Sequence, residues 1–169
     1  MDYHAGATVM HWVHGLGKVI RREKRDVLGR QALYYAVHVG NMIVWVPVDD
    51  KVGQRLRPPT GKIRFKRIVA LLSKPGEPLP SDRHERKLLL SEYLTDGSLE
   101  SSVRIIRALL AYQRVRSLND NDQAVMHRVQ SALLAEWEYV LATTPAEAQI
   151  QLQDLLASAA AGSGGKHHV

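Results

Sequence analysis

The stretch Ala32-Leu33-Tyr34-Tyr35-Ala36-Val37-His38-Val39-Gly40-Asn41-Met42-Ile43-Val44-Trp45-Val46-Pro47 decides the fold of the first part of this 169-residue chain. Its two runs, residues 32–39 and 42–47, are rich in the β-branched and aromatic residues that favour strands. Only Gly40-Asn41 separates them, and a two-residue linker of this kind suits a primed turn with positive φ. We therefore predict a β-hairpin that ends at Pro47, because proline cannot donate to a strand ladder.

Shorter strand candidates precede this hairpin. Residues 8–13 and 18–22 are predicted to be strands on either side of a two-glycine turn, and residues 23–30 a charged loop. Several short strands joined by tight turns are typical of a small, strongly curved sheet. We predict a Tudor- or SH3-like β barrel over residues 1–72.

The second part of the chain changes to helical periodicity. Residues 73–80 hold three prolines and a glycine and are predicted to be a hinge. Residues 81–161 carry helix start signals, which predict a bundle of about four α-helices; the signals are Asp82 with Glu85, Ser98, Asp120 with Gln123, and Thr144-Pro145 with Glu147. The predicted fold class is therefore α+β, with residues 162–169 as a flexible tail.

Composition excludes several classes of protein. The absence of cysteine excludes disulfides, thiolate zinc sites and cysteine nucleophiles. The sequence has neither the apolar span of a membrane helix nor the start of a signal peptide. It has no HExxH or Gly-x-Ser-x-Gly motif, and the adjacent Asp49-Asp50 suits a turn better than an acid/base pair. We expect a cytoplasmic, monomeric, non-catalytic protein that needs no cofactor or metal.

The net charge of +6 is unevenly distributed along the sequence. Residues 1–80 hold 14 Lys and Arg against 6 Asp and Glu, a net +8, and residues 81–169 hold 9 against 11, a net −2. A basic half indicates an anionic partner, either nucleic acid or an acidic protein surface. Solvated basic faces are the alternative.

Three features indicate binding. A basic cluster lies beside the hairpin, formed by Arg21, Arg22, Lys24 and Arg25. Trp45 lies either in the core or on an edge strand that is open to a partner strand. The third feature is a cationic helix start, where residues at i, i+3 and i+4 share one face; these are Arg83, Arg86 and Lys87. Such cations oppose the helix macrodipole, which favours an anionic ligand such as backbone phosphate over a solvated face.

The order and spacing of several segments resemble the CarD/CdnL family of transcription regulators over residues 5–157. The segments are His14-Gly15-Leu16-Gly17-Lys18-Val19, Tyr34-Tyr35, Met42-Ile43-Val44-Trp45-Val46-Pro47-Val48, Gly53-Gln54-Arg55-Leu56-Arg57, Leu94-Thr95-Asp96-Gly97, Val103-Arg104-Ile105-Ile106-Arg107-Ala108-Leu109 and Ser117-Leu118. The first half is similar to a Tudor-like RNA-polymerase-interacting domain that transcription-repair coupling factors share. Its pairing with a helical half favours the regulators, because coupling factors continue into a helicase.

This resemblance implies a bacterial transcription regulator without catalytic activity. Its β domain would bind the β lobe of the RNA polymerase β subunit through Arg25, Val44, Trp45, Val46 and Pro47. Its helical domain would contact promoter DNA at the upstream edge of the melted bubble and stabilise the open complex, through Arg83, Arg86 and Lys87. The alternative is a module that binds nucleic acid directly, without polymerase.

Three positions depart from the pattern of that family. Arg83 stands where members commonly carry a tryptophan that wedges into DNA at the bubble edge. An arginine binds phosphate or enters a narrow minor groove, but it cannot wedge as an indole does. Trp45 stands where an arginine is frequent, which implies a more apolar docking contact, and Gln123 stands where relatives can carry a basic residue.

Overall fold

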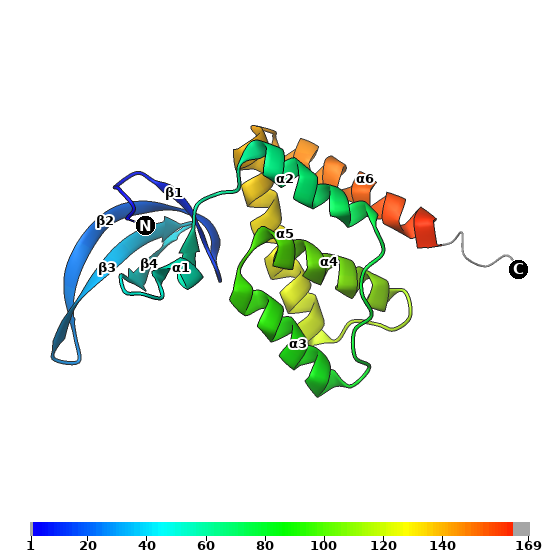
Figure 1. The fold of residues 1–169 in the computed structure, drawn as a ribbon, viewed down its shortest axis with the longest axis horizontal. Helices are drawn as coiled ribbons and strands as arrows, with labels where there is room; N and C mark the ends of the chain where they lie inside the picture. The colour runs from blue at the N-terminus through cyan, green and yellow to red at the C-terminus, as the bar shows by residue number, and fades with distance from the viewer. Residues whose placement is uncertain (1, 164–169) are drawn as a thin grey trace, which may run out of the picture. The chain divides into compact units, whose positions relative to one another are not determined.

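The computed structural model describes residues 2–163, so most of the predicted tail lies outside the described residues. The chain forms two compact units, Met1–Pro59 and Thr60–Val169. The first holds an antiparallel sheet of five strands, and five α-helices follow in the second (Figure 1). The predicted α+β class is confirmed, whereas the number of helices is one more than predicted.

The sheet of the first unit is open. Its strands run in the order β4-β3-β2-β1-β5, and their bounds are β1 Thr8–His11, β2 Gly15–Val27, β3 Arg30–Val39, β4 Met42–Pro47 and β5 Leu56–Arg57. A short helix, α1 Val52–Arg55, precedes β5. The predicted barrel is not closed, because β4 and the two-residue β5 lie at opposite edges and no pairing joins them.

The predicted hairpin is present, and Gly40 takes a φ of +56° at its turn. A second, longer hairpin joins β2 to β3, and it replaces the charged loop expected over residues 23–30. Arg25 therefore lies on a strand, paired with Ala32. The turn of this hairpin places Leu28 and Gly29 at φ of 53° and 77°, the signs that a type I′ turn requires at both positions.

One face of the sheet carries the core of the first unit. This core comprises Val9, Val19, Tyr35, Val37, Val39, Val46 and Leu56. Gly17 lies on the same face, where an added Cβ would come within 2.7 Å of Val39 Cγ2. The absence of a side chain at Gly17 therefore lets β3 pack its valines closely over β2.

The helical unit begins earlier in the chain than the sequence predicts. Its helices are α2 Lys62–Val69, a 3₁₀ helix Ala70–Ser73, α3 Arg83–Asp96, α4 Leu99–Gln113, α5 Asp120–Leu141 and α6 Pro145–Ser163. Phe65 of α2 is fully buried, and its ring meets that of Trp137 edge-on at 5.6 Å. Residues 60–72 thus belong to the helical core rather than to the β domain.

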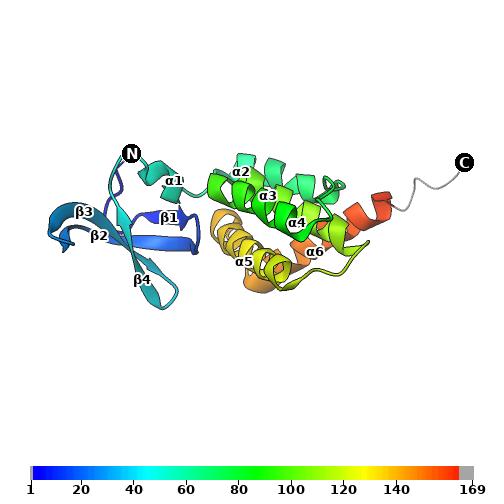
Figure 2. The same cartoon turned by 90° about the horizontal axis from the view of Figure 1, so that it is seen from below.

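Central in this unit is α4, which contacts α2, α3 and α5. Figure 2 shows α5 and α6 on the opposite side of the unit from α2 and α3. The proline-rich segment 73–80 is held against α4 instead of linking two domains. Arg107 donates from Nε to the Lys74 carbonyl at 3.2 Å and from Nη2 to the Pro75 carbonyl at 2.5 Å. Arg104 donates to Glu77 at 2.8 Å.

The earlier boundary redistributes the charge. Residues 1–59 hold nine basic and five acidic residues, a net +4, and residues 60–169 hold 14 and 12, a net +2. The difference arises because α2 carries Lys62, Arg64, Lys66 and Arg67. The contrast between a basic β half and an acidic helical half is therefore not a property of the folded units.

Most helix starts lie where the sequence places them. The Asp82 carboxylate accepts from the Glu85 N–H at 2.9 Å, and Ser98 caps α4. The cap of α5 is Asn119 rather than Asp120, in a reciprocal capping box with Asp122. Gly162 and Ser163 of the predicted tail continue α6.

Candidate binding surfaces

The face of the sheet opposite the core carries the first candidate surface. Strand pairing places Arg21, Ala36 and Trp45 side by side in one row across β2, β3 and β4. Directly paired residues of antiparallel strands share a face, and neighbours along a strand alternate. Trp45 therefore points away from the core that Val46 enters. We call the surface formed by Arg21, Arg25, Ile43 and Trp45 the outer β4 surface.

Arg25 and Trp45 lie in contact on this surface. The Arg25 guanidinium carbon is 3.9 Å from the centroid of the indole, and that of Arg21 is 5.6 Å away. Arg21 is also paired with Glu23, from Nε to Oε2 at 2.7 Å. Cation–π contacts of this kind fix the indole in place while it stays partly open to solvent. Two of the residues predicted to bind polymerase are thus brought together.

The other predicted residues of β4 are divided between the two faces. Val46 is 1% exposed, so its side chain cannot reach a partner, and the partly buried Val44 packs against the same core. Pro47 is paired with Tyr34 at the end of the strand, on the outer face. Ile43, which was not among the predicted contact residues, is 48% exposed. Residues alternate between the two faces along a strand, so Ile43 lies on the same face as Trp45. The sequence could therefore have indicated Ile43 together with Trp45.

At Ile43 and Trp45 the backbone of β4 points away from β3, toward the open edge of the sheet. The Val48 N–H donates to the Leu33 carbonyl at 2.9 Å, which makes these two a hydrogen-bonded pair. In an antiparallel ladder such pairs alternate with non-bonded ones. By this alternation Val44 and Val46 bond to β3, whereas the N–H and C=O of Ile43 and Trp45 point to the open edge. The edge therefore offers backbone groups for pairing with another strand.

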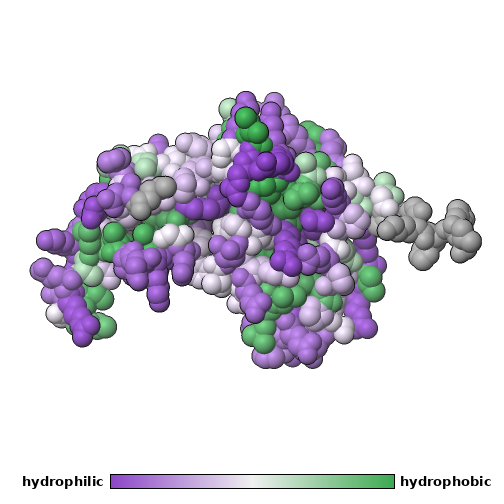
Figure 3. Space-filling model, in the orientation of Figure 1, coloured by the Kyte–Doolittle hydropathy of each residue, from purple (hydrophilic) through white to green (hydrophobic). Residues whose placement is uncertain are grey.

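The distal half of the β2–β3 hairpin extends beyond both neighbouring strands, since β4 pairs only with residues 34–39 and β1 with residues 15–18. The space-filling view shows hydrophilic side chains at this end beside apolar ones (Figure 3). Leu28 at the tip is 99% exposed. Leu28 thus has both a positive φ and a solvent-exposed apolar side chain, and both are unfavourable for leucine in the unbound protein.

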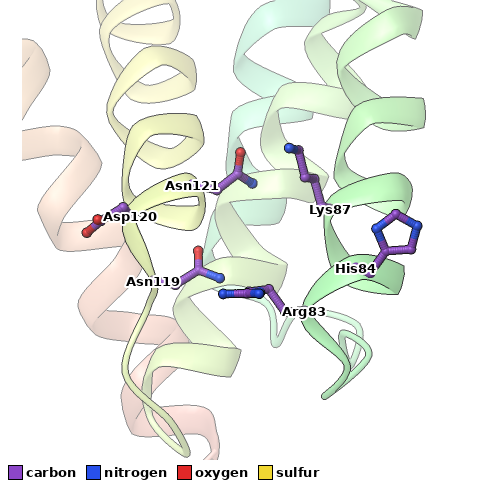
Figure 4. Close-up of a pocket in the computed structure, with 6 residues that line it drawn as sticks. All are labelled: Arg83, His84, Lys87, Asn119, Asp120 and Asn121. Atoms are coloured by element: carbon purple, nitrogen blue, oxygen red, sulfur yellow. The ribbon is translucent and has the colours of Figure 1, made fainter.

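A second candidate surface is a cleft between the starts of α3 and α5. It has a volume of about 450 Å³ and is lined by Arg83, His84, Lys87, Asn119, Asp120 and Asn121. Figure 4 shows Arg83, Lys87, Asn119 and Asn121 directed toward the space between the helices, with Asp120 and His84 turned away. The side chains that face the cleft are therefore cationic or neutral amides, which suits an anionic ligand.

Arg86 does not share the surface of Arg83 and Lys87, contrary to the prediction that all three face a ligand. Its side chain is buried, and its Nε lies 3.1 Å from each oxygen of Asp122. Nη1 donates to the carbonyls of Pro80 and Ser81, at 3.2 Å each, and the guanidinium lies over the Tyr112 ring. The hydrogen bond to Asp122 raises the pKa of Arg86 despite burial, which keeps the group charged.

Arg86 is thus a positioning residue for the cleft. It joins the first turn of α3 to Asp122, which lies in the first turn of α5. On α3, Arg83 lies three residues before Arg86, and Lys87 lies one residue after it. The ion pair therefore fixes the spacing of the two helix starts that form the walls of the cleft.

No family model matches the chain. Within residues 2–163, no group of three or more His, Asp or Glu residues is arranged to hold a metal ion. In the same part of the chain, no helix is both long and apolar enough to cross a membrane.

Proposed function

We propose that this protein is a non-catalytic bacterial transcription regulator, as its resemblance to the CarD/CdnL family implies. It binds the β lobe of RNA polymerase through the outer β4 surface and contacts promoter DNA through the cleft of Arg83 and Lys87. The observation that carries this proposal is the Arg25–Trp45 contact beside an unpaired strand edge.

Several properties of the outer β4 surface support a protein partner. Tryptophan and arginine are the residues most enriched among those that dominate binding energy at protein interfaces. Ile43 adds apolar area next to Trp45, and the free edge adds backbone groups in a fixed register. A partner strand added at this edge would gain hydrogen bonds from the backbone and specificity from Trp45 and Arg25.

DNA contact is assigned to Arg83 and Lys87 without Arg86. The cleft suits backbone phosphate because two cations and two amide side chains converge on it. Once bound to polymerase, the protein would hold these cations at the upstream edge of the melted promoter and slow collapse of the open complex.

A pull-down with the isolated β lobe of RNA polymerase tests the polymerase contact. Trp45→Glu and Arg25→Glu are each expected to lower capture at least ten-fold, because they place a carboxylate at the contact. Trp12→Glu is the matched control, since Trp12 is 40% exposed in the same unit and follows β1, which pairs with the other edge strand, β5. Capture that does not depend on Trp45 would contradict the proposed docking surface.

The direct nucleic-acid alternative makes a different prediction. It requires tight, steeply salt-dependent binding of bare duplex DNA that is unaffected by polymerase. Fluorescence anisotropy with a labelled duplex at several salt concentrations, measured with and without the β lobe, separates the two functions.

A further inference from the structure

The cleft of Arg83 and Lys87 continues into an apolar groove between α3 and α5. A second hollow of about 260 Å³ shares Lys87 and Asn121 with the cleft. It is lined further along by Leu90, Leu94, Val125 and Arg128. Both α3 and α5 pack against α4, so the groove lies between two helices that a third helix holds in place.

The groove differs from a phosphate-binding surface in its middle section. Leu90 is buried at its base, and Leu94 and Val125 are partly exposed along it. A phosphodiester backbone gains nothing from such an apolar section, whereas a leucine-bearing peptide buries its side chains there.

The charges of the groove favour an acidic peptide. Arg83 and Lys87 lie toward one end, and Arg128 lies farther along α5. Burial lowers the pKa of Arg128 from its ordinary value, so its guanidinium lies where water is partly excluded. Attraction between opposite charges is stronger in such surroundings than in bulk solvent.

We propose that the α3–α5 groove binds an acidic, amphipathic helical segment of a partner protein. Its leucine-like side chains would lie against Leu90, Leu94 and Val125, and its carboxylates would pair with Lys87 and Arg128. From Arg83 to Leu94, α3 rises about 16 Å, which matches a helix of about eleven residues. Because this segment would cover Lys87, it would compete with DNA for the cleft.

The test uses the full chain and a fluorescein-labelled probe peptide of about fourteen glutamates and leucines, with leucines at i, i+3, i+4 and i+7. The comparison peptide has serine in place of every leucine and the same charge. Fluorescence anisotropy is expected to show at least ten-fold tighter binding of the leucine peptide. Equal affinity for the two peptides would overturn the proposal, since only charge would then be recognised.

Two variants in the groove and a control variant on α6 locate the bound peptide. Ala124 is exposed on the groove wall, so Ala124→Trp fills the groove and should weaken the leucine peptide at least ten-fold. Ala157→Trp, at an exposed alanine of α6, should leave its affinity unchanged. Arg128→Gln should weaken the leucine peptide several-fold, and circular dichroism verifies that each variant is folded. Unchanged peptide affinity in both Ala124→Trp and Arg128→Gln would overturn the proposal.

DNA binding distinguishes this inference from the proposed function. Ala124→Trp is expected to spare duplex DNA, which contacts the cleft rather than the groove. If the variant weakens DNA as much as the peptide, the groove is a nucleic-acid channel and the inference is wrong. Capture by the polymerase β lobe depends on Trp45, so it tests the other function independently.

Discussion

Replacement of Asp122 by asparagine tests whether a buried ion pair holds the starts of α3 and α5 together. Asp122 is 1% exposed and Arg86 is 3% exposed. Nη2 of Arg86 lies 3.1 Å from Asp122 Oδ2, and Nε lies equally close to both oxygens. Asparagine has nearly the same shape as aspartate, so the change removes a charge without opening a cavity. The guanidinium is then left in the interior without its counter-ion.

Breaking one side of a buried ion pair costs about 3–5 kcal/mol. Arg86 retains its hydrogen bonds to two backbone carbonyls and its contact with the Tyr112 ring, 4.5 Å from the centroid. We therefore expect the lower value, about 3 kcal/mol of unfolding free energy. In a unit of this size each kcal/mol corresponds to about 4 °C, so the melting temperature should fall by roughly 12 °C.

Circular dichroism at 222 nm measures this change, because the helical unit supplies nearly all of the helix in the described chain. Arg86→Met combined with Asp122→Leu replaces the pair by apolar side chains of similar volume. This double variant should be more stable than Asp122→Asn but remain about 1–2 kcal/mol below the unchanged protein, because the Asn119 N–H and the carbonyls of Pro80 and Ser81 lose their hydrogen bonds. A loss below about 1 kcal/mol in Asp122→Asn would refute the reasoning, as would a double variant no more stable than the single one.

Three further predictions concern stability. Leu28→Asn should stabilise the β unit by about 1 kcal/mol, because asparagine tolerates the φ of 53° better than leucine; urea unfolding followed by tryptophan fluorescence measures this gain. Gly76→Ala should destabilise the helical unit by about 1–3 kcal/mol, because its Cβ would lie 2.2 Å from a backbone oxygen of α4. Gly162→Ala is its control, because among the described residues no atom outside its own stretch of α6 lies within 4 Å of the added carbon, and equal urea midpoints for the two would contradict the prediction. The Glu85 N–H lowers the pKa of the Asp82 carboxyl, so the stability that Asp82 provides is present at neutral pH and lost as the pH falls below about 4. Asp82→Asn should flatten this part of the pH profile, and thermal unfolding at pH 7 and pH 3 compares the two proteins.

Features set by neighbouring residues were predictable from the sequence. The hairpin around Gly40 and the caps at Asp82 and Ser98 depend on a few adjacent residues, and each is present. The β2–β3 ribbon was missed because residues 21–26 are polar at every position. A strand that is open to solvent on both faces has no apolar alternation to reveal it.

The domain boundary depends on packing between distant segments. Residues 62–69 have a mixed apolar period, and their helix is stabilised by burial of Phe65 against Trp137. Three prolines in residues 73–80 indicate a break in secondary structure. They do not reveal that Arg107 binds this segment to α4.

The role of Arg86 shows the same limit at the candidate site. Spacing at i, i+3 and i+4 places three cations on one side of a helix, but it does not say which of them points toward the core. Here the deciding partner is Asp122, 36 residues away along the chain. Trp45 is limited in a similar way. Alternation places its side chain on the face opposite Val44 and Val46, but only the folded sheet shows which of the two faces is the core.

The burial of Arg86 limits how strongly the cleft can bind DNA. Each phosphate contact contributes about −0.9 to the slope of log affinity against log salt, so Arg83 and Lys87 together account for a slope of about −2. Raising salt from 50 to 200 mM would then weaken binding by only about ten-fold, which corresponds to a small electrostatic contribution. A contact of this size becomes effective when another interaction already holds the protein beside the DNA, as docking on polymerase through Trp45 would do. A slope steeper than about −4 for the protein alone would require further cations and would favour direct nucleic-acid binding.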